Sequence, residues 1–261
     1  MSASSPMPLT VVLPVFRNGP FLEELHGRLQ TVMRTCATDY RLIFVNDASP
    51  DDSLEILERI ARRDQRTLVI DLDRNVGQQK AILMGLSFSR GHWTILLDAD
   101  LQDPPEAIPD LLVAAQRGEH AALFAGRSGR HTPAGRLLTS RLFKGLLHRL
   151  TGVPETAGLF VVIRDDLRRF LLQFPTDLPL VTAMIGLSGL PMGVIPVPRR
   201  PRPMGRSAYS GFRRLLLGLG ALGLVLVHRL KPHGIPCLER PGALPLFRVI
   251  GPGGAEGGRP D

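Results

Sequence analysis

The sequence predicts an α/β fold, built on a mostly parallel sheet with helices on both faces. Two observations predict it. Apolar runs rich in β-branched residues recur between Thr10 and Ser128, and they alternate with helical stretches of similar length. The runs are continuous rather than interrupted by polar residues, which is typical of strands that are covered on both faces. Strands of this kind that alternate with helices indicate a doubly wound sheet.

The expected elements follow one another in a regular order. The predicted strands of the first half are Thr10–Phe16, Leu42–Val45, Leu68–Leu72, Trp93–Leu97 and Ala121–Ala125. The helices between them are Phe21–Arg34, Asp51–Arg63, Gly77–Ser89 and Glu106–Arg117. Beyond Arg127 we expect helices at Leu137–Leu150, Leu167–Phe174 and Leu180–Leu187, and strands at Leu159–Ile163 and Met192–Val197.

The last part of the chain differs in composition. An apolar helix is expected at about Phe212–Leu230, and its central run, Leu215–Val227, has basic residues at both ends. This run would span about 20 Å, short of a hydrocarbon core of about 30 Å. It fits contact with a membrane surface as well as burial in a core or a dimer interface. Residues 231–261, rich in Gly and Pro without periodicity, predict a poorly ordered tail. The expected units are therefore 1–209, 210–230 and 231–261.

Composition and charge bound the class of protein. Of the 261 residues, 44% are hydrophobic and 21% are charged, which excludes a disordered chain, a collagen and a disulfide-rich scaffold. Cys36 and Cys237 have no disulfide or zinc spacing, and no signal peptide pattern precedes the first strand, so a cytoplasmic setting is expected. The net charge of +8, nearly all of it from arginine, indicates an anionic partner such as a phosphorylated metabolite, nucleic acid or an anionic membrane surface.

Polar side chains gather where the first four predicted strands end. Because ligands of parallel sheets bind at the carboxyl ends of the strands, these loops predict the functional site. Three of the four loops contain carboxylates, which favours a cation together with a polyhydroxylated or nucleotide ligand. The loops are Pro14–Asn18, Asn46–Ser53, Asp73–Gly77 and Asp98–Glu106.

The pair Asp98 and Asp100 predicts a metal site. A spacing of two at the end of a strand puts both side chains on the same side of it. Mg²⁺ and Mn²⁺ are hard cations that accept one or two carboxylates and complete their shells with substrate phosphate and water. Gln102, again two residues on, could add a neutral oxygen. The competing interpretation is that this pair caps a helix or a turn.

Asp47 has two interpretations. Its carboxylate, just beyond the second strand, could accept hydrogen bonds from a base edge or a ribose hydroxyl. Asp47 and Ser49 could equally cap the helix that begins near Asp51. Asn75 and Gly77 open the next helix, where glycine permits a close approach of the backbone. A helix cap followed by a turn glycine explains this second pair as well.

Taken in order, these strings resemble the family 2 glycosyltransferases of the GT-A fold. The closest likeness is to the polyprenyl-phosphate branch, of the dolichol-phosphate mannose synthase type. The most specific string is Asp98-Ala-Asp-Leu-Gln-Asp-Pro-Pro-Glu106. Others are Val11–Phe16, Val45–Ser53, Arg74–Ala81, Arg127–Arg130, Ser140–Phe143 and the spacing Arg202-x-x-Gly-x-Ser-x-Tyr209. The resemblance covers about residues 9–215.

The resemblance implies a role for each matching residue. The nucleotide would be held by Pro14, Phe16 and Asp47, with Asn75, Gly77 and Lys80 also on the substrate-binding side. The metal, Mg²⁺ or Mn²⁺, and the donor diphosphate would be held by Asp98, Asp100 and Gln102. The acceptor phosphate and the leaving diphosphate would be surrounded by Arg127, Arg130, Arg202, Ser207 and Tyr209. The catalytic set would be Asp100 with the three arginines.

The charge of the chain fits a phosphate acceptor. A phosphate monoester is anionic near neutral pH and needs no general base, but cations must offset its repulsion from the donor diphosphate. The second half of the chain supplies arginines. It lacks the Glu-Asp pair followed by Gln-x-x-Arg-Trp that hydroxyl-acceptor relatives carry. Asp165, Asp166 and Asp177 remain candidate bases, although helix starts and turns explain them better.

We therefore expect a metal-dependent, inverting glycosyltransferase that moves a sugar from a UDP- or GDP-linked donor to a polyprenyl phosphate. It would be cytoplasmic and peripheral at the inner face of the cell membrane, on an anionic surface, without nucleic acid, and compatible with a homo-oligomer. One alternative is a soluble family 2 enzyme that acts on a hydroxyl of a glycan or small molecule. Another is a non-catalytic basic module for membrane or nucleic acid, which explains the charge but not the polar strand ends.

Overall fold

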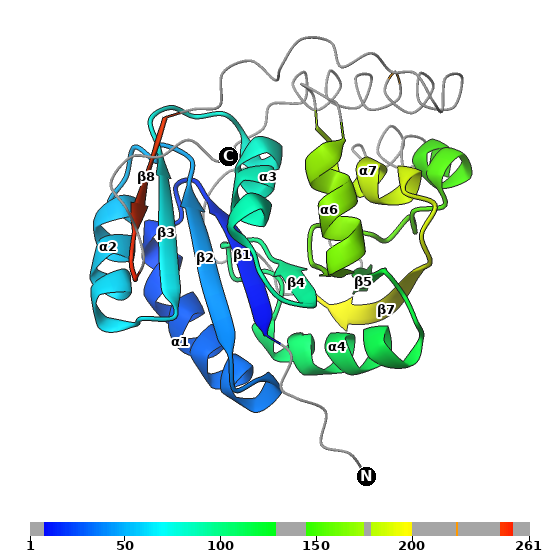
Figure 1. Cartoon of the computed structure of the whole chain (residues 1–261), viewed down its shortest axis with the longest axis horizontal. Coiled ribbons are helices and arrows are strands. Elements are labelled where there is room, and N and C mark those ends of the chain that lie inside the picture. The colour runs from blue at the N-terminus through cyan, green and yellow to red at the C-terminus, as the bar shows by residue number, and fades with distance from the viewer. Residues whose placement is uncertain (1–7, 129–144, 175–178, 200–222, 224–245, 253–261) are drawn as a thin grey trace.

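The computed structural model describes residues 8–128, 145–174, 179–199, 223 and 246–252. They form an eight-stranded sheet in the order β7-β5-β6-β4-β1-β2-β3-β8 (Figure 1). The strands are β1 (Leu9–Val15), β2 (Tyr40–Asn46), β3 (Thr67–Leu72), β4 (Trp93–Leu96), β5 (Ala122–Ser128), β6 (Val161–Arg164), β7 (Met192–Pro198) and β8 (Phe247–Ile250). Strands β3, β2, β1 and β4 run parallel, as does the pair β5–β7, and only β6 and β8 pair antiparallel with their neighbours. The prediction of a mostly parallel sheet is confirmed.

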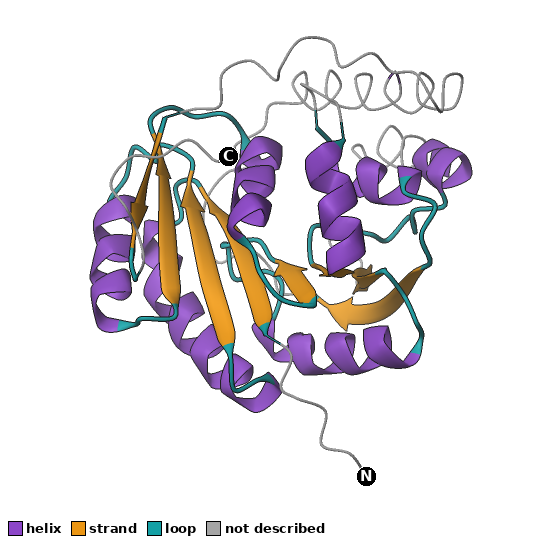
Figure 2. Cartoon of the chain, in the orientation of Figure 1, coloured by secondary structure: helices purple, strands orange, loops and turns teal. Residues whose placement is uncertain are grey.

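Helices cover both faces of the sheet (Figure 2). They are α1 (Gly19–Cys36), α2 (Ser53–Arg63), α3 (Gln78–Phe88), the 3₁₀ turn η1 (Pro105–Ala107), α4 (Ile108–Arg117), α6 (Asp165–Gln173) and α7 (Val181–Leu187). Helices α1, α2 and α4 pack on one face, whereas α3, α6 and α7 pack on the other. Residues 145–151 are also helical and agree with the end of the helix expected at Leu137–Leu150, whose beginning lies outside the described residues.

The central strand β1 shows why both faces must be apolar. Val11 and Leu13 join the core under α1, while Val12 between them joins the core under α3. Successive side chains of a strand point to opposite faces, so a strand buried on both sides has no polar position. Helix α3 lies so close to this strand that a Cβ on Gly85 would meet Cγ1 of Val12 at 2.3 Å. Glycine at position 85 therefore sets the distance between helix and sheet.

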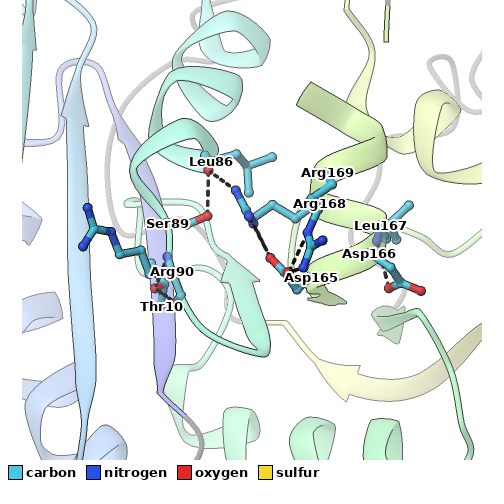
Figure 3. A network of polar contacts seen from close by, with 9 residues as sticks. All are labelled: Thr10, Leu86, Ser89, Arg90, Asp165, Asp166, Leu167, Arg168 and Arg169. Carbon is cyan, nitrogen blue, oxygen red and sulfur yellow. Dashed lines mark hydrogen bonds and ion pairs between the residues drawn. The ribbon is translucent and has the colours of Figure 1, made fainter. Parts of the chain in front are cut away.

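A polar network attaches α6 to the parallel half of the sheet (Figure 3). The backbone amide of Asp165 donates to the carbonyl of His92 at 3.0 Å. The guanidinium of Arg168 binds the Asp165 carboxylate and also donates to the carbonyl of Leu86 at the end of α3. Asp165 and Asp166 lie in the first turn of α6, so their interpretation as a helix start is confirmed. Asp177 lies outside the described residues.

One expectation about the C-terminal part is wrong. Strand β8 lies inside residues 231–261, which the composition predicts to be a poorly ordered tail. It pairs antiparallel with β3 from Phe247 opposite Leu72 to Ile250 opposite Val69, and so it covers an edge of the sheet. The helix expected at Phe212–Leu230 lies outside the described residues, apart from Gly223, which is helical and exposed. The boundaries at 209 and 230 stay predictions.

Candidate active site

Asp98 and Asp100 lie in a turn that follows β4, the strand beside β1. The argument that the pleat of a strand aligns them is therefore wrong, because β4 ends at Leu96. The turn itself brings them to the carboxyl edge of the sheet. Leu101 adopts a left-handed φ of 58°, and the Gln102 backbone amide donates to Oδ1 of Asp100 at 3.2 Å. Asp100 is 7% exposed, so its carboxylate is held within this turn.

The carboxylate of Asp98 is approached from two other elements. The side-chain amide of Gln78, at the first turn of α3, donates a hydrogen bond to Oδ1. Arg199, which directly follows β7, places Nη2 3.9 Å from Oδ2. The same guanidinium has its Nε 3.1 Å from Oδ1 of Asp103. Both aspartates are largely buried, with side chains 16% and 7% exposed. Segments from α3, the turn after β4 and the end of β7 therefore meet at Asp98.

The residues present fit a divalent cation that is shared with a phosphate ligand. Among the described residues, no group of three or more His, Cys, Asp or Glu side chains is arranged to enclose a metal alone. The turn instead offers two carboxylates, Asp98 and Asp100, which are two residues apart in the chain. Mg²⁺ and Mn²⁺ are commonly bound by one or two carboxylates plus substrate phosphates and water. Gln102 follows in the same turn, where its backbone amide supports Asp100.

The carboxylate of Asp47 binds the loop after β3 and does not cap α2, the helix that follows Asp47 in the chain. Its carboxylate accepts hydrogen bonds from the backbone amides of Val76 and Gly77, at 2.7 and 2.9 Å, and from the side chain of Asn75 at 3.0 Å. Burial raises the pKa of Asp47, and the two backbone amides partly offset that effect. Gly77 has a φ of 88°, which glycine adopts without strain. Asp47 therefore fixes the backbone that leads into α3, and its role toward a nucleotide stays a prediction.

The loop after β1 is tied to the loop after β2. The backbone amide of Arg17 donates to Oγ of Ser49 at 2.7 Å, and that of Gly19 donates to Oδ2 of Asp51 at 3.2 Å. Burial raises the pKa of Asp51, but hydrogen bonds from Ser53 and Gly19 outweigh it and leave the pKa lowered. The guanidinium of Arg17 lies 5.4 Å from the ring centre of Phe16. These contacts join the loops that follow β1 and β2 at the carboxyl edge of the sheet.

Of the other predicted site residues, the structure places only some near this edge of the sheet. Pro14 is buried within β1 in register with Val45, so in this structure it belongs to the sheet. Phe16 is half-buried beyond that strand, and Lys80 is exposed in the first turn of α3. Arg127 lies near the end of β5, in register with Val197 of β7. The remaining predicted residues lie outside the described part of the chain: Arg130, Arg202, Ser207 and Tyr209.

Sequence reasoning missed three polar residues of the site: Gln78, Asp103 and Arg199. Gln78 and Asp103 stand inside the strings that carry the family resemblance, and Arg199 opens the run Arg199–Arg206. The signal available in the sequence was that these residues stand next to predicted site residues. The folded structure identifies them, because α3, the turn after β4 and the end of β7 come together only in the fold.

A bidentate ion pair supports the segment that follows the turn. Arg28 of α1 donates through Nε and Nη2 to the two carboxylate oxygens of Glu106, at 2.8 and 2.7 Å. Glu106 is the last residue of the string that begins at Asp98, and it lies in η1. The hydrogen bond to Glu106 raises the pKa of Arg28. The pair attaches the segment after Asp98 and Asp100 to α1, which covers the face of the sheet opposite to α3.

Comparison with known proteins defines the class. The model of the family described as Glycosyl transferase family 2 matches residues 10–162, which is more than half of the chain. The chain belongs to glycosyl transferase family 2. This confirms the predicted enzyme class, a glycosyltransferase.

Relatives narrow the resemblance. The uncharacterized glycosyltransferase YkcC of Bacillus subtilis (strain 168) is 29% identical over 216 residues, which cover 82% of this chain and 67% of that protein. The undecaprenyl-phosphate 4-deoxy-4-formamido-L-arabinose transferase of Pseudomonas paraeruginosa (strain DSM 24068 / PA7) is 40% identical over 146 residues. That match covers 56% of this chain and 43% of the transferase, so the chain aligns with less than half of it. Similarity to a polyprenyl-phosphate sugar transferase is thereby confirmed.

Solved structures confirm the GT-A-like fold. The mannosyltransferase PcManGT from Pyrobaculum calidifontis, in complex with GDP-Man and Mn²⁺, superposes with a TM-score of 0.63 at 16% identity. The superposition covers 90% of this chain and 67% of that one. The glucosyl-3-phosphoglycerate synthase from Mycobacterium tuberculosis, in complex with Mn²⁺, UDP and glucosyl-3-phosphoglycerate, gives 0.58 at 17% identity, over 85% of this chain and 79% of that one. Within the described ranges, no helix has the length and apolar character needed to span a bilayer.

Proposed function

We propose that this chain transfers a sugar from a nucleotide-diphosphate sugar to a polyprenyl phosphate, with inversion at the anomeric carbon and with Mg²⁺ or Mn²⁺. The observation that carries the proposal is the turn after β4, which holds both Asp98 and Asp100 at the carboxyl edge of the sheet. This is the edge where open α/β sheets bind nucleotides. The undecaprenyl-phosphate transferases among the relatives support the choice of acceptor.

The sugar donor would lie across the loops that end β1, β2 and β4. Phe16 and the backbone held by Asp47 would border the nucleotide, as the family resemblance implies. Asp98 and Asp100 would face the diphosphate, with Gln102 next to them. When bound between these groups, Mg²⁺ or Mn²⁺ supplies positive charge against the leaving diphosphate.

The acceptor needs cations more than it needs a base. A phosphate-monoester oxygen attacks the anomeric carbon, and the bond from that carbon to the donor diphosphate breaks, with the electron pair leaving on the diphosphate. No proton has to be removed from an anionic nucleophile, but two groups of like charge have to approach each other. Arg127 at the end of β5 and Arg199 after β7 lie on neighbouring strands of this edge. We propose that Arg127, together with Arg130 and Arg202, surrounds the acceptor phosphate and the leaving diphosphate.

The membrane part of the proposal depends on the sequence. We propose that the protein is peripheral at the cytoplasmic face of the membrane, on anionic lipid, because the polyprenyl acceptor is a membrane lipid. The apolar run Leu215–Val227, with basic residues on both sides, is the proposed contact. Basic residues contribute about 1 kcal/mol each on an anionic surface.

The test is a transfer assay with several sugar donors. The protein is incubated with undecaprenyl phosphate in vesicles, Mn²⁺ and labelled UDP- and GDP-sugars in parallel. We expect label from one of them in an organic-extractable lipid phosphate, and none with the Asp100→Asn variant. Label that enters only water-soluble products would contradict the lipid acceptor and favour the enzyme that acts on a hydroxyl. No transfer from any sugar donor to lipid or to added glycan would contradict the proposal as a whole.

A further inference from the structure

Three carboxylates stand within six residues of the turn after β4: Asp98, Asp100 and Asp103. Their exposure is low, since Asp100 and Asp103 are 7% and 5% exposed and the side chain of Asp98 is 16% exposed. Asp98 and Asp103 both lie within ion-pair distance of Arg199. Carboxylates with so little access to solvent repel each other unless a cation compensates them. Among the charged contacts resolved in this structure, Arg199 is the cation that reaches two of the three.

The two contacts of Arg199 are unequal. Its Nε lies 3.1 Å from Oδ1 of Asp103, which is within ion-pair distance, although the two atoms do not have the geometry of a hydrogen bond. Its Nη2 lies 3.9 Å from Oδ2 of Asp98, at the outer limit of such a pair. Asp98 is held independently through Oδ1 by Gln78. Arg199 therefore lies closer to Asp103 than to Asp98, and its contact with Asp98 is at the longer distance.

We propose that Arg199 is the resident counter-ion of this site and exchanges partners during binding. Without metal and sugar donor, its guanidinium compensates both Asp98 and Asp103. A divalent cation bound by the Asp98 carboxylate would displace the guanidinium, which would then turn to the donor diphosphate while it stays close to Asp103. Arginine suits both positions because its planar fork binds carboxylate and phosphate alike. This inference depends on the proposed function for the identity of the diphosphate, but not for the competition at Asp98.

The exchange predicts opposite effects of one substitution on two ligands. In Arg199→Gln, the positive charge that competes for Asp98 is gone, so Mn²⁺ alone is expected to bind about tenfold more tightly, as for the loss of one nearby charge in a partly solvated site. The same variant lacks the diphosphate contact, so UDP or GDP in saturating Mn²⁺ is expected to bind about tenfold more weakly. A residue that only supports the fold would weaken both ligands or neither.

Mn²⁺ binding is measured from the electron paramagnetic resonance signal of free Mn²⁺, and nucleotide binding by calorimetry, both on the full chain. Arg59→Gln is the matched control, because Arg59 pairs with Glu55 on the exposed surface of α2. Arg199→Lys keeps the charge without the fork, so its Mn²⁺ affinity should stay near that of the wild type while nucleotide binding falls. Melting curves in chelator establish that each variant is folded.

Two results would overturn the inference. If Arg199→Gln binds Mn²⁺ no more tightly than Arg59→Gln, Arg199 does not compete for Asp98. If it binds UDP and GDP as tightly as the wild type, the guanidinium does not reach the diphosphate. The proposed function fails separately, when the wild-type protein with Mn²⁺ binds neither UDP nor GDP. In that case the Mn²⁺ titration still decides whether Arg199 compensates Asp98.

Discussion

The side-chain amide of Gln78 donates a hydrogen bond to the carboxylate of Asp98, and so joins the first turn of α3 to the turn after β4. The next residue, Gln79, points to a different partner, since its Oε1 accepts the backbone amide of Val181 at 2.9 Å. Two adjacent glutamines therefore have separate tasks. One orients a carboxylate of the site, and the other attaches α7 to α3.

This difference predicts that the same substitution lowers activity at one position and stability at the adjacent one. Gln78→Met removes a hydrogen bond to a charged group, worth about 1.5–3 kcal/mol, and we expect kcat/KM to fall about tenfold or more with little change in Tm. Gln79→Met leaves the buried amide of Val181 without this acceptor, so we expect a loss of about 1–3 kcal/mol in unfolding free energy. Steady-state kinetics and chemical denaturation measure the two. Equal loss of stability in both variants would contradict the assignment.

The aspartate pair predicts a metal-dependent ligand effect. Asp100→Asn keeps the size and the acceptor oxygen of the side chain but removes the charge that a hard cation prefers. We expect turnover to be abolished and Tm without ligands to stay close to that of the wild type. The rise in Tm on adding Mn²⁺ with UDP or GDP should shrink, because a ligand stabilises a protein only through binding.

Differential scanning fluorimetry with and without Mn²⁺ and nucleotide checks this prediction. Asp110→Asn in α4 is a suitable control, since that helix lies on the opposite face of the sheet from α3. Full transfer activity of the wild type in excess chelator would exclude a required metal.

A buried cluster at the other end of the sheet predicts acid sensitivity. Asp64 accepts hydrogen bonds from His26 at 2.9 Å and from the hydroxyl of Thr67 at 2.8 Å. Burial raises the pKa of Asp64, but these bonds and the backbone amide of Arg66 outweigh it and leave the pKa lowered. A carboxyl whose pKa is lower in the folded state adds stability above its unfolded pKa. That stability is lost as the pH falls through the folded pKa.

Asp64→Asn isolates this contribution. We expect the wild type to exceed the variant in unfolding free energy by about 1.5–3 kcal/mol at neutral pH, the range for a hydrogen bond to a charged group. The difference should decrease from about pH 5 toward pH 2. Urea denaturation at a series of pH values measures it. A difference that does not change over this interval would show that the charge of Asp64 is not what stabilises the cluster.

Strand β8 predicts a stability effect far from the parallel core. Phe247 packs edge-on against Phe88 of α3, with ring centres 5.6 Å apart, and lies opposite Leu72 of β3. It is half-buried, so Phe247→Ala should cost about 1–2 kcal/mol, less than the 3–5 kcal/mol of a fully buried phenylalanine. Leu246 next to it is 70% exposed, and Leu246→Ala should leave the unfolding free energy unchanged. Equal Tm values for both variants would contradict the packing.

The sequence predicted the parallel half of the sheet well because that half has a local signal. Each of its central strands is a continuous apolar run, as in β1, where Val11, Val12 and Leu13 are all fully buried. Strand β8 has no such signal, since it is four residues long and lies among glycines and prolines. Its pairing depends on the edge that β3 offers after folding. Non-local pairing of this kind cannot be read from periodicity.

The sequence indicated which residue types form the candidate site, but it did not indicate which contacts those residues make. The string from Asp98 to Glu106 marked the turn, but the left-handed φ of Leu101 was not visible in it. Asp47 was predicted as a candidate site residue, but its observed partners, Val76 and Gly77, depend on how the loop after β3 folds back. Arg199 is one of many arginines in the chain, and only its position after β7 distinguishes it.

The proposed membrane contact leads to the last prediction. Arg213 and Arg214 precede the apolar run, and His228 and Arg229 follow it, all outside the described residues. Deleting the chain after Tyr209 would also remove β8, so it would confuse membrane binding with the sheet edge. A double charge reversal, Arg213→Glu with Arg214→Glu, keeps β8. Each basic residue contributes about 1 kcal/mol on an anionic surface, so the reversal should weaken binding at least about tenfold.

Flotation with vesicles of anionic lipid at low salt measures this binding, and the same double reversal at Arg59 and Arg62 on the surface of α2 controls for net charge. We expect the wild type and the control to float, and the Arg213/Arg214 variant to stay at the bottom. High salt should release the wild type, because salt screens contacts between exposed charges and lipid headgroups. If the wild type does not float at low salt, the apolar run is not a membrane contact. The apolar run would then no longer support the proposal that the acceptor is a polyprenyl phosphate.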